Sequence, residues 1–159
     1  MRKRTLIIGM VSAALIGIAA LAYFVSDRDD ATSGFISPAN RELVAKGKVI
    51  YASHCASCHG ANLEGQANWR QRLPNGRLPA PPHDETGHTW HHPDAVLIDI
   101  TENGLVPEKT APKGYESDMP AFGKVLSDEE IVAVLAYIKS TWPAEALEMQ
   151  KTMTMQQNP

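Results

Sequence analysis

The chain has 159 residues, of which 43% are hydrophobic and 21% charged, and its formal net charge is −3 at pH 7. This composition is that of a globular protein, which excludes wholesale disorder, and the length allows one ordinary domain with a short appendage. The negative charge also argues against a nucleic-acid-binding protein, because such proteins usually carry a basic face.

Residues 1–26 form a segment of their own. The basic stretch "MRKR" precedes an uncharged apolar run from Thr5 to Val25, which as a helix is long enough to cross the hydrocarbon core of a membrane. Basic residues before the run and acidic residues after it predict a single-pass anchor with the remainder of the chain outside. A cleaved signal peptide is the alternative, because "ALA" at 20–22 resembles a processing site.

Residues 27–36 are polar and are predicted to be a flexible linker to a domain at 37–143. That domain is expected to begin with a helix, in which Ser37 is the cap and Pro38 takes the first helical position. The apolar face of this helix consists of Leu43, Val44, Gly47, Ile50 and Tyr51. Glycine in the middle of a helix costs about 1 kcal/mol relative to alanine, so Gly47 indicates that another helix crosses closely there.

Cys55 and Cys58 are the only cysteines of the chain, and His59 follows them directly. A zinc site would lack further cysteine ligands, a thioredoxin-like pair would lack a βαβ pattern around it, and a disulfide across so short a loop would stabilise little. C-x-x-C-H is the attachment signature of covalent haem, in which two thiols bind one edge of the porphyrin and the histidine binds its iron. We therefore predict haem c, one per chain, with His59 as the first axial ligand.

Most histidines of the chain lie within one short stretch, as His83, His88, His91 and His92. Prolines on both sides prevent this stretch from being one helix, so no helical metal face is expected. The four side chains are predicted to be structural or to bond haem propionates, while a separate copper or zinc site and axial ligation of the iron are the alternatives. Residues 93–104 then predict a short helix, with Pro93 at its first position and Gly104 past its end.

Met119 is the methionine best placed to supply the second axial ligand of the iron. It lies in a proline-containing loop, outside any helical apolar stripe that would make it a core residue. A thioether suits this position, because it favours ferrous iron and raises the reduction potential. The other methionines lie in the N-terminal segment or in the C-terminal tail, at Met1, Met10, Met149, Met153 and Met155.

A last helix of the domain is predicted after this loop. It begins at a capping box of Ser127 and Glu130 and ends at Trp142 and Pro143. Its apolar positions are Ile131, Val134, Leu135 and Ile138. Residues 144–159 are expected to form a tail, with about a turn of helix followed by a disordered end at "TMTMQQNP".

The order of these elements resembles the class I, single-haem cytochromes c. The stretches "YASHCASCHG", "DMPAFGKVLSDEEI" and "VLAYIKSTWP" carry the resemblance, and "GANLEGQANWR" with the histidine run is similar to a bacterial membrane-anchored subgroup. The resemblance implies a mainly α fold in which N- and C-terminal helices cross around a covalent haem, with one N-terminal transmembrane helix in addition. The crossing is expected where Gly47 and Tyr51 face Val134 and Tyr137.

The resemblance also implies residues of the haem environment. In this family a proline after the haem motif packs near the proximal histidine, where a backbone carbonyl accepts its Nδ1–H, and Pro81 or Pro82 is expected in that role beside His59. Trp90 is expected to cover a haem edge or to donate its indole N–H to a propionate.

A haem iron with both axial positions filled has no place for a substrate, so the chain is predicted to be an electron carrier and no enzyme. It is expected to shuttle single electrons among respiratory membrane partners, at the bacterial inner membrane with the haem domain in the periplasm. Two alternatives stay open. One is a haem-based gas sensor, in which Met119 yields to a diatomic ligand, and the other is a copper-handling protein that uses the His83–His92 cluster.

Overall fold

The computed structural model describes residues 34–157, and the regular structure of this part of the chain is helical. Its elements are α2 (Arg41–His54), α3 (Ala56–His59), the 3₁₀ turn η1 (Thr89–His91), α4 (Asp94–Asn103), α5 (Asp128–Lys139) and α6 (Ala144–Gln157). The predicted mainly α class is therefore confirmed. Between residues 34 and 157, no helix is long and apolar enough to cross a membrane, and the anchor predicted at Thr5–Val25 lies outside the described residues.

Helix α2 begins later than the sequence predicted. Its N-cap is Asn40, whose side-chain oxygen accepts a hydrogen bond from Leu43 N at 3.1 Å. Ser37 and Pro38 precede the helix, so their prediction as cap and first helical residue was wrong. The physical reason is a competing local bond, because the Ser37 hydroxyl accepts from Ala39 N and stabilises a turn instead of a helix end.

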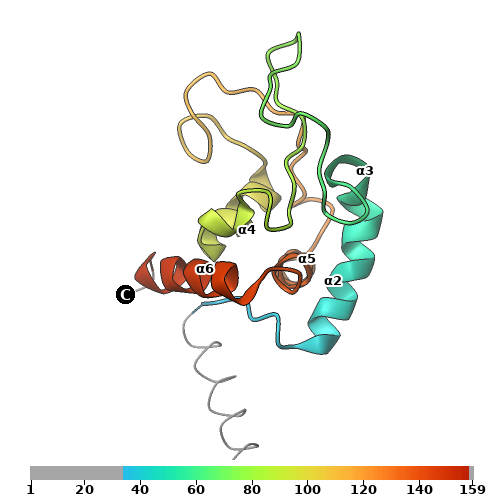
Figure 1. Ribbon diagram of the computed structural model, residues 1–159, viewed down its shortest axis with the longest axis vertical. Helices are drawn as coiled ribbons and strands as arrows, with labels where there is room; N and C mark the ends of the chain where they lie inside the picture. Colours follow the sequence, from blue (N-terminus) through green and yellow to red (C-terminus); the bar gives the residue numbers. More distant parts are fainter. Residues whose placement is uncertain (1–33, 158–159) are drawn as a thin grey trace, which may run out of the picture.

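Helices α2 and α5 pack across each other, and Figure 1 views α5 nearly end-on beside α2. A Cβ atom at Gly47 would lie 1.9 Å from the carbonyl oxygen of Ala133 and 3.0 Å from Cβ of Tyr137, so only glycine allows this approach. The rings of Tyr51 and Tyr137 meet beside it, with centroids 5.4 Å apart. The expected helix crossing is confirmed, with Ala133 as the backbone partner of the glycine and Val134 buried in the same core.

Helix α5 has the predicted capping box, because Glu130 N donates to the Ser127 hydroxyl and Ser127 N donates to the Glu130 carboxylate. Its predicted apolar positions are buried, namely Ile131, Val134, Leu135 and Ile138. The helix ends at Lys139, earlier than the predicted end at Trp142. The reason is the cap, because Ser140 N bonds the carbonyls of the last turn and tightens it.

Helix α4 follows the histidine-rich stretch. Pro93 has extended backbone, with φ −70° and ψ 160°, and is the N-cap, so its prediction as the first helical residue was wrong by one position. Gly104 ends the helix as predicted, because its φ of 75° lies in the left-handed region that favours glycine.

Helix α6 corrects the prediction of a disordered C-terminal end. Residues up to Gln157 are helical, and Ala146, Gln150 and Thr154 form a buried stripe at intervals of four residues. Two of these three residues are polar, so the apolar periodicity that reveals a packed helix is absent from the sequence. The helix packs against η1, and the ribbon in Figure 1 places it beside the start of the described chain.

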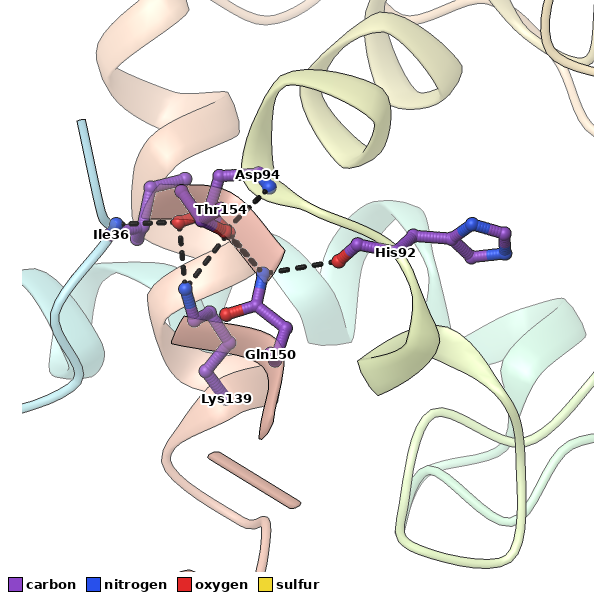
Figure 2. A network of polar contacts seen from close by, with 6 residues as sticks. All are labelled: Ile36, His92, Asp94, Lys139, Gln150 and Thr154. Carbon is purple, nitrogen blue, oxygen red and sulfur yellow. Dashed lines mark hydrogen bonds and ion pairs between the residues drawn. The ribbon is translucent and has the colours of Figure 1, made fainter. Parts of the chain in front are cut away.

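A buried polar network joins α6 to the rest of the fold, and Figure 2 shows it from close by. At its centre, the Asp94 carboxylate accepts bonds from Lys139 Nζ at 2.8 Å, from Gln150 Nε2 at 2.7 Å and from Ile36 N at 2.7 Å. Thr154 Oγ1 accepts from Asp94 N at 3.1 Å. Because these groups come from α4, α5, α6 and the segment before α2, one carboxylate holds four parts of the chain together.

Candidate functional site

The haem-attachment motif comprises Cys55, which is the N-cap of α3, and Cys58 and His59 in the single turn of that helix. The amide of Cys58 donates to Cys55 O at 3.1 Å and that of His59 donates to the same oxygen at 2.9 Å, so all three side chains emerge from one turn. The two cysteines do not form a disulfide with each other, and Cys55 is partly buried while Cys58 is exposed. Burial, and to a lesser degree the neighbouring Cys58, raises the pKa of the Cys55 thiol to about 11.

The turn is held in place by the chain on both sides of it. Gly60 ends α3 with a φ of 83°, and its carbonyl accepts a bond from the Tyr51 hydroxyl at 2.8 Å. Gly65 N then donates to His59 O at 2.7 Å. A Cβ atom on Gly65 would lie 2.5 Å from Pro82 N, so glycine at this position lets the loop after the motif lie directly against the proline segment.

His59 is buried, and its Nδ1 lies 2.8 Å from the carbonyl oxygen of Pro81. A carbonyl only accepts, so Nδ1 carries the proton and donates it, and Nε2 keeps its lone pair. Burial lowers the pKa of His59, although the bond to Pro81 opposes this, so the ring is neutral at neutral pH. Of the two prolines expected near His59, Pro81 supplies the accepting carbonyl.

These three side chains fit a covalently attached haem. The two cysteines lie one helical turn apart, as bonds to one edge of a porphyrin require, and the neutral imidazole has an unprotonated nitrogen that can bind a metal. The pattern of donors is therefore consistent with the signature read from the sequence.

Met119 lies in the long loop between α4 and α5 and is partly buried. That loop is attached to the end of α4, because Phe122 N donates to Thr101 O at 3.0 Å and Gly123 N donates to the next carbonyl at 2.9 Å. The Phe122 ring also meets the ring of His54 edge-on, with centroids 6.3 Å apart. Since His54 precedes Cys55, these contacts bring the methionine loop to the side of the haem motif.

The same loop is attached on its other side to the segment after the motif. Arg77 forms exposed ion pairs with Asp118 and, at 3.4 Å, with Glu116. The hydroxyl of Ser117 accepts a bond from Met119 N at 3.0 Å. The end of α4, His54 of α2 and the segment around Arg77 therefore hold the backbone around Met119 in place.

The four histidines of the 83–92 stretch lie in different surroundings. The His83 ring stacks on His59, with centroids 4.0 Å apart and planes at 22°. His88 stacks on Trp69 at 5.6 Å and meets His92 edge-on at 5.4 Å, while His91 stacks on its neighbour Trp90. Among residues 34–157, no group of three or more histidine, cysteine, aspartate or glutamate side chains is arranged to hold a metal ion.

Burial is also the main influence on the protonation of these rings. It lowers the pKa of His83 well below its ordinary value, with His59 and His88 as smaller causes. It lowers the pKa of His88 and of His92 in the same direction. These three imidazoles are therefore neutral at neutral pH, which suits their packing against other rings.

Trp90 has a partner for its indole N–H within the protein. Nε1 donates to the backbone carbonyl of Glu85 at 3.4 Å, and the indole ring stacks on His91 with centroids 3.7 Å apart. The expected propionate contact thus has a competing acceptor in this structure.

Sequence reasoning missed three residues that build the site. Thr89 Oγ1 lies 2.8 Å from His83 Nδ1, and Trp142 Nε1 donates to His83 O at 2.7 Å. Tyr51, predicted only as a helix-packing residue, donates its hydroxyl to the turn after the motif. Buried tryptophan and tyrosine usually find a hydrogen-bond partner, which is a signal that the sequence offered.

Comparison with known proteins gives a consistent result. Residues 44–142 match the protein family described as "Cytochrome c". A curated relative, "Cbb3-type cytochrome c oxidase subunit CcoP" of Azospirillum sp. (strain B510), is 30% identical over 97 residues, which is 60% of this chain. The match spans only 27% of that relative's length. The comparison with solved structures gave no significant match.

Proposed function

Because this chain belongs to the cytochrome c family, we propose that it is a one-electron carrier with a single haem c, attached at Cys55 and Cys58 and ligated by His59 and Met119. Bound haem would supply an iron that takes up and releases one electron as it passes between its ferric and ferrous states. The protein side chains supply attachment, orientation and exclusion of water.

The observation that carries this proposal is the bond from His59 Nδ1–H to Pro81 O. When one ring nitrogen of a metal-binding histidine donates a hydrogen bond in this way, the tautomer is fixed. The other ring nitrogen then gives its electron pair to the metal more readily. The two thiols of the same turn, Cys55 and Cys58, add the attachment points. Such a site needs no acid or base, so it is suited to electron transfer better than to catalysis.

Further residues are proposed to line the haem. Pro81 and Pro82 lie against the loop that follows the motif, as the Gly65 contact shows, and they form the wall on the side of His59. Trp90 is proposed at an edge of the site, with its ring as the contact because its N–H already bonds Glu85 O.

The partners are proposed to be redox proteins of a respiratory membrane. The printed name of the CcoP relative, a subunit of a cytochrome c oxidase, supports this class of partner. We propose in addition that residues 1–26 anchor the chain in a bacterial inner membrane and that the haem domain works in the periplasm. An anchored carrier has a raised effective concentration near membrane partners.

The test compares Met119→Ala with the parent and with Met149→Ala, a methionine on α6 whose side chain is 45% exposed. Haem should stay with the polypeptide in acidified organic solvent for all three proteins. The far-red band of ferric Met-ligated haem should be present in the parent and in Met149→Ala and lost in Met119→Ala.

Two results would overturn the proposal. Haem that is extracted by the solvent would contradict attachment at the two cysteines, and an unchanged Met119→Ala spectrum would contradict the sulfur ligand. A parent protein whose ferrous spectrum changes under carbon monoxide would favour the gas sensor over the carrier, because it would show an axial position that opens.

A further inference from the structure

His59 is restrained at two places on its ring. The bond from Nδ1 to Pro81 O restrains one edge, but a single hydrogen bond leaves the ring able to tilt about it. The His83 ring covers one face at a centroid distance of 4.0 Å and an interplanar angle of 22°. Stacked flat rings attract each other, so His83 opposes the tilt.

His83 is itself firmly held. Its amide donates to Leu63 O at 2.8 Å, and its carbonyl accepts from Trp142 Nε1 at 2.7 Å. Its ring nitrogen Nδ1 lies 2.8 Å from the hydroxyl of buried Thr89. Backbone and ring are therefore attached to three different parts of the chain, one after the motif, one in η1 and one after α5.

The turn that brings Thr89 back to His83 is also tightly packed. Gly87 N donates to Asp84 O at 3.2 Å, and a Cβ atom on Gly87 would lie 2.1 Å from Pro82 O. The stretch after Pro82 thus folds back over the prolines, and the ring of His83 is directed onto His59.

We propose that His83 is a positioning residue for His59, whose flat ring sets the plane in which the His59 imidazole presents Nε2 to the iron. This inference rests on the proposed function, because it takes His59 as an axial ligand. The contribution of His83 is a planar face in a fixed orientation. A phenyl ring would supply the same face, whereas a branched aliphatic side chain would fill the volume without one.

The experiment compares four haem-loaded variants with the parent protein: His83→Ala, His83→Leu, His83→Phe and, as control, His88→Ala. His88 belongs to the same stretch but stacks on Trp69. The ferric electron paramagnetic resonance g-values report the orientation of an axial imidazole, and a redox titration reports the ferric-to-ferrous ratio at fixed ambient potential.

We expect altered g-values in His83→Ala and His83→Leu, with a change in that ratio of about threefold, or ~28 mV at 59 mV per factor of ten for one electron. The ratio should move toward ferric in His83→Ala, because water that enters the space stabilises the more highly charged iron. His88→Ala should match the parent in both measurements. His83→Phe keeps a flat ring but loses the bond to Thr89, so it should change both measurements less than His83→Leu does.

Parent-like g-values in His83→Leu would overturn the inference, even if that variant unfolds more easily, because a purely structural residue changes stability alone. If neither His83→Ala nor His83→Leu retains haem, the g-values of Thr89→Val test the inference instead. Valine keeps the volume of threonine but removes the hydroxyl that bonds the His83 ring. Parent-like g-values in that variant would also overturn the inference. Loss of covalent haem from the parent itself, by contrast, would refute the proposed function.

Discussion

The Nδ1 atom of His59 donates a hydrogen bond to the carbonyl of Pro81, and that bond determines which ring nitrogen remains available. Burial acts on the same ring by disfavouring its charged form. Both effects leave a neutral imidazole with one free lone pair, which is the form that binds a metal. The functional property of this residue thus comes from a backbone group 22 positions away in sequence.

His88, which stacks on Trp69, and His92, which meets His88 edge-on, should make the stability of the domain depend on pH. In the folded state, burial holds the pKa of His88 and of His92 below the ordinary value, whereas in the unfolded chain both return to about 6.5. As pH falls from about 7 to 5, the unfolded state binds protons that the folded state excludes, so the free energy of unfolding decreases. This stability is fully present above the unfolded pKa.

Denaturant titrations across this pH range measure the effect. His88→Phe should show a smaller decrease in the free energy of unfolding than the parent, because one of the groups with a lowered pKa is removed. The slopes of the two proteins against pH should differ by less than one bound proton. Thr152→Ala, at an exposed position of α6, should keep the parental slope. A His88→Phe slope equal to or steeper than that of the parent would contradict the assignment.

At the scale of helices, the approach of α2 to α5 depends on the absence of a side chain at Gly47. The contact is to backbone, the carbonyl of Ala133, which cannot move away as the end of a flexible side chain could. The aromatic pair of Tyr51 and Tyr137 packs beside it, and Tyr51 in turn bonds the turn after His59. The helix crossing therefore also positions the functional site.

Gly47→Ala should destabilise the protein, although alanine favours helix formation by about 1 kcal/mol relative to glycine. The added Cβ would separate the two helices, and such overpacking costs about 1–3 kcal/mol. The free energy of unfolding in denaturant measures the change. Lys48→Ala, on the exposed side of α2, should stay within about 0.5 kcal/mol of the parent. A Gly47→Ala protein as stable as Lys48→Ala would show that the helices do not pack this closely.

Over the whole molecule, the Asp94 carboxylate joins parts of the chain that no local pattern connects. Lys139 and Asp94 form an ion pair whose side chains are 0% and 1% exposed. Two buried charges are costly to desolvate, and hydrogen bonds from Gln150 and Ile36 reduce that cost by satisfying the carboxylate oxygens. As Figure 2 shows, the same cluster reaches the His92 carbonyl through Gln150, and so joins α6 to the histidine stretch.

Removal of one partner of this pair should be strongly destabilising. Lys139→Met leaves the Asp94 carboxylate buried without its cation and should lower the free energy of unfolding by about 3–5 kcal/mol. The double variant with Asp94→Asn should lose less, because no unpaired charge remains. Lys46→Met removes the exposed pair with Glu129 and should cost less than about 1 kcal/mol. Equal losses for the two lysine variants would refute a special role for the buried pair.

The sequence by itself determined the features that depend on near neighbours. Cys55, Cys58 and His59 lie within one helical turn, and the capping box joins Ser127 to Glu130 three positions later. Both features can therefore be recognised from the spacing of residues in the sequence. Gly47 was informative for a similar reason, since a glycine within a helix has a cost that only close packing explains.

The tertiary structure decided what depends on distant residues. It selected Pro81 over Pro82 as the acceptor and stacked His83 on His59. It also extended the predicted turn at 144–151 into a helix that buries Gln150 and Thr154, where a disordered end was expected from residue 152. The reason is that a polar side chain is buried only when its partners arrive from other elements. Those partners lie 22 to 60 positions away, so no periodicity along the chain records them.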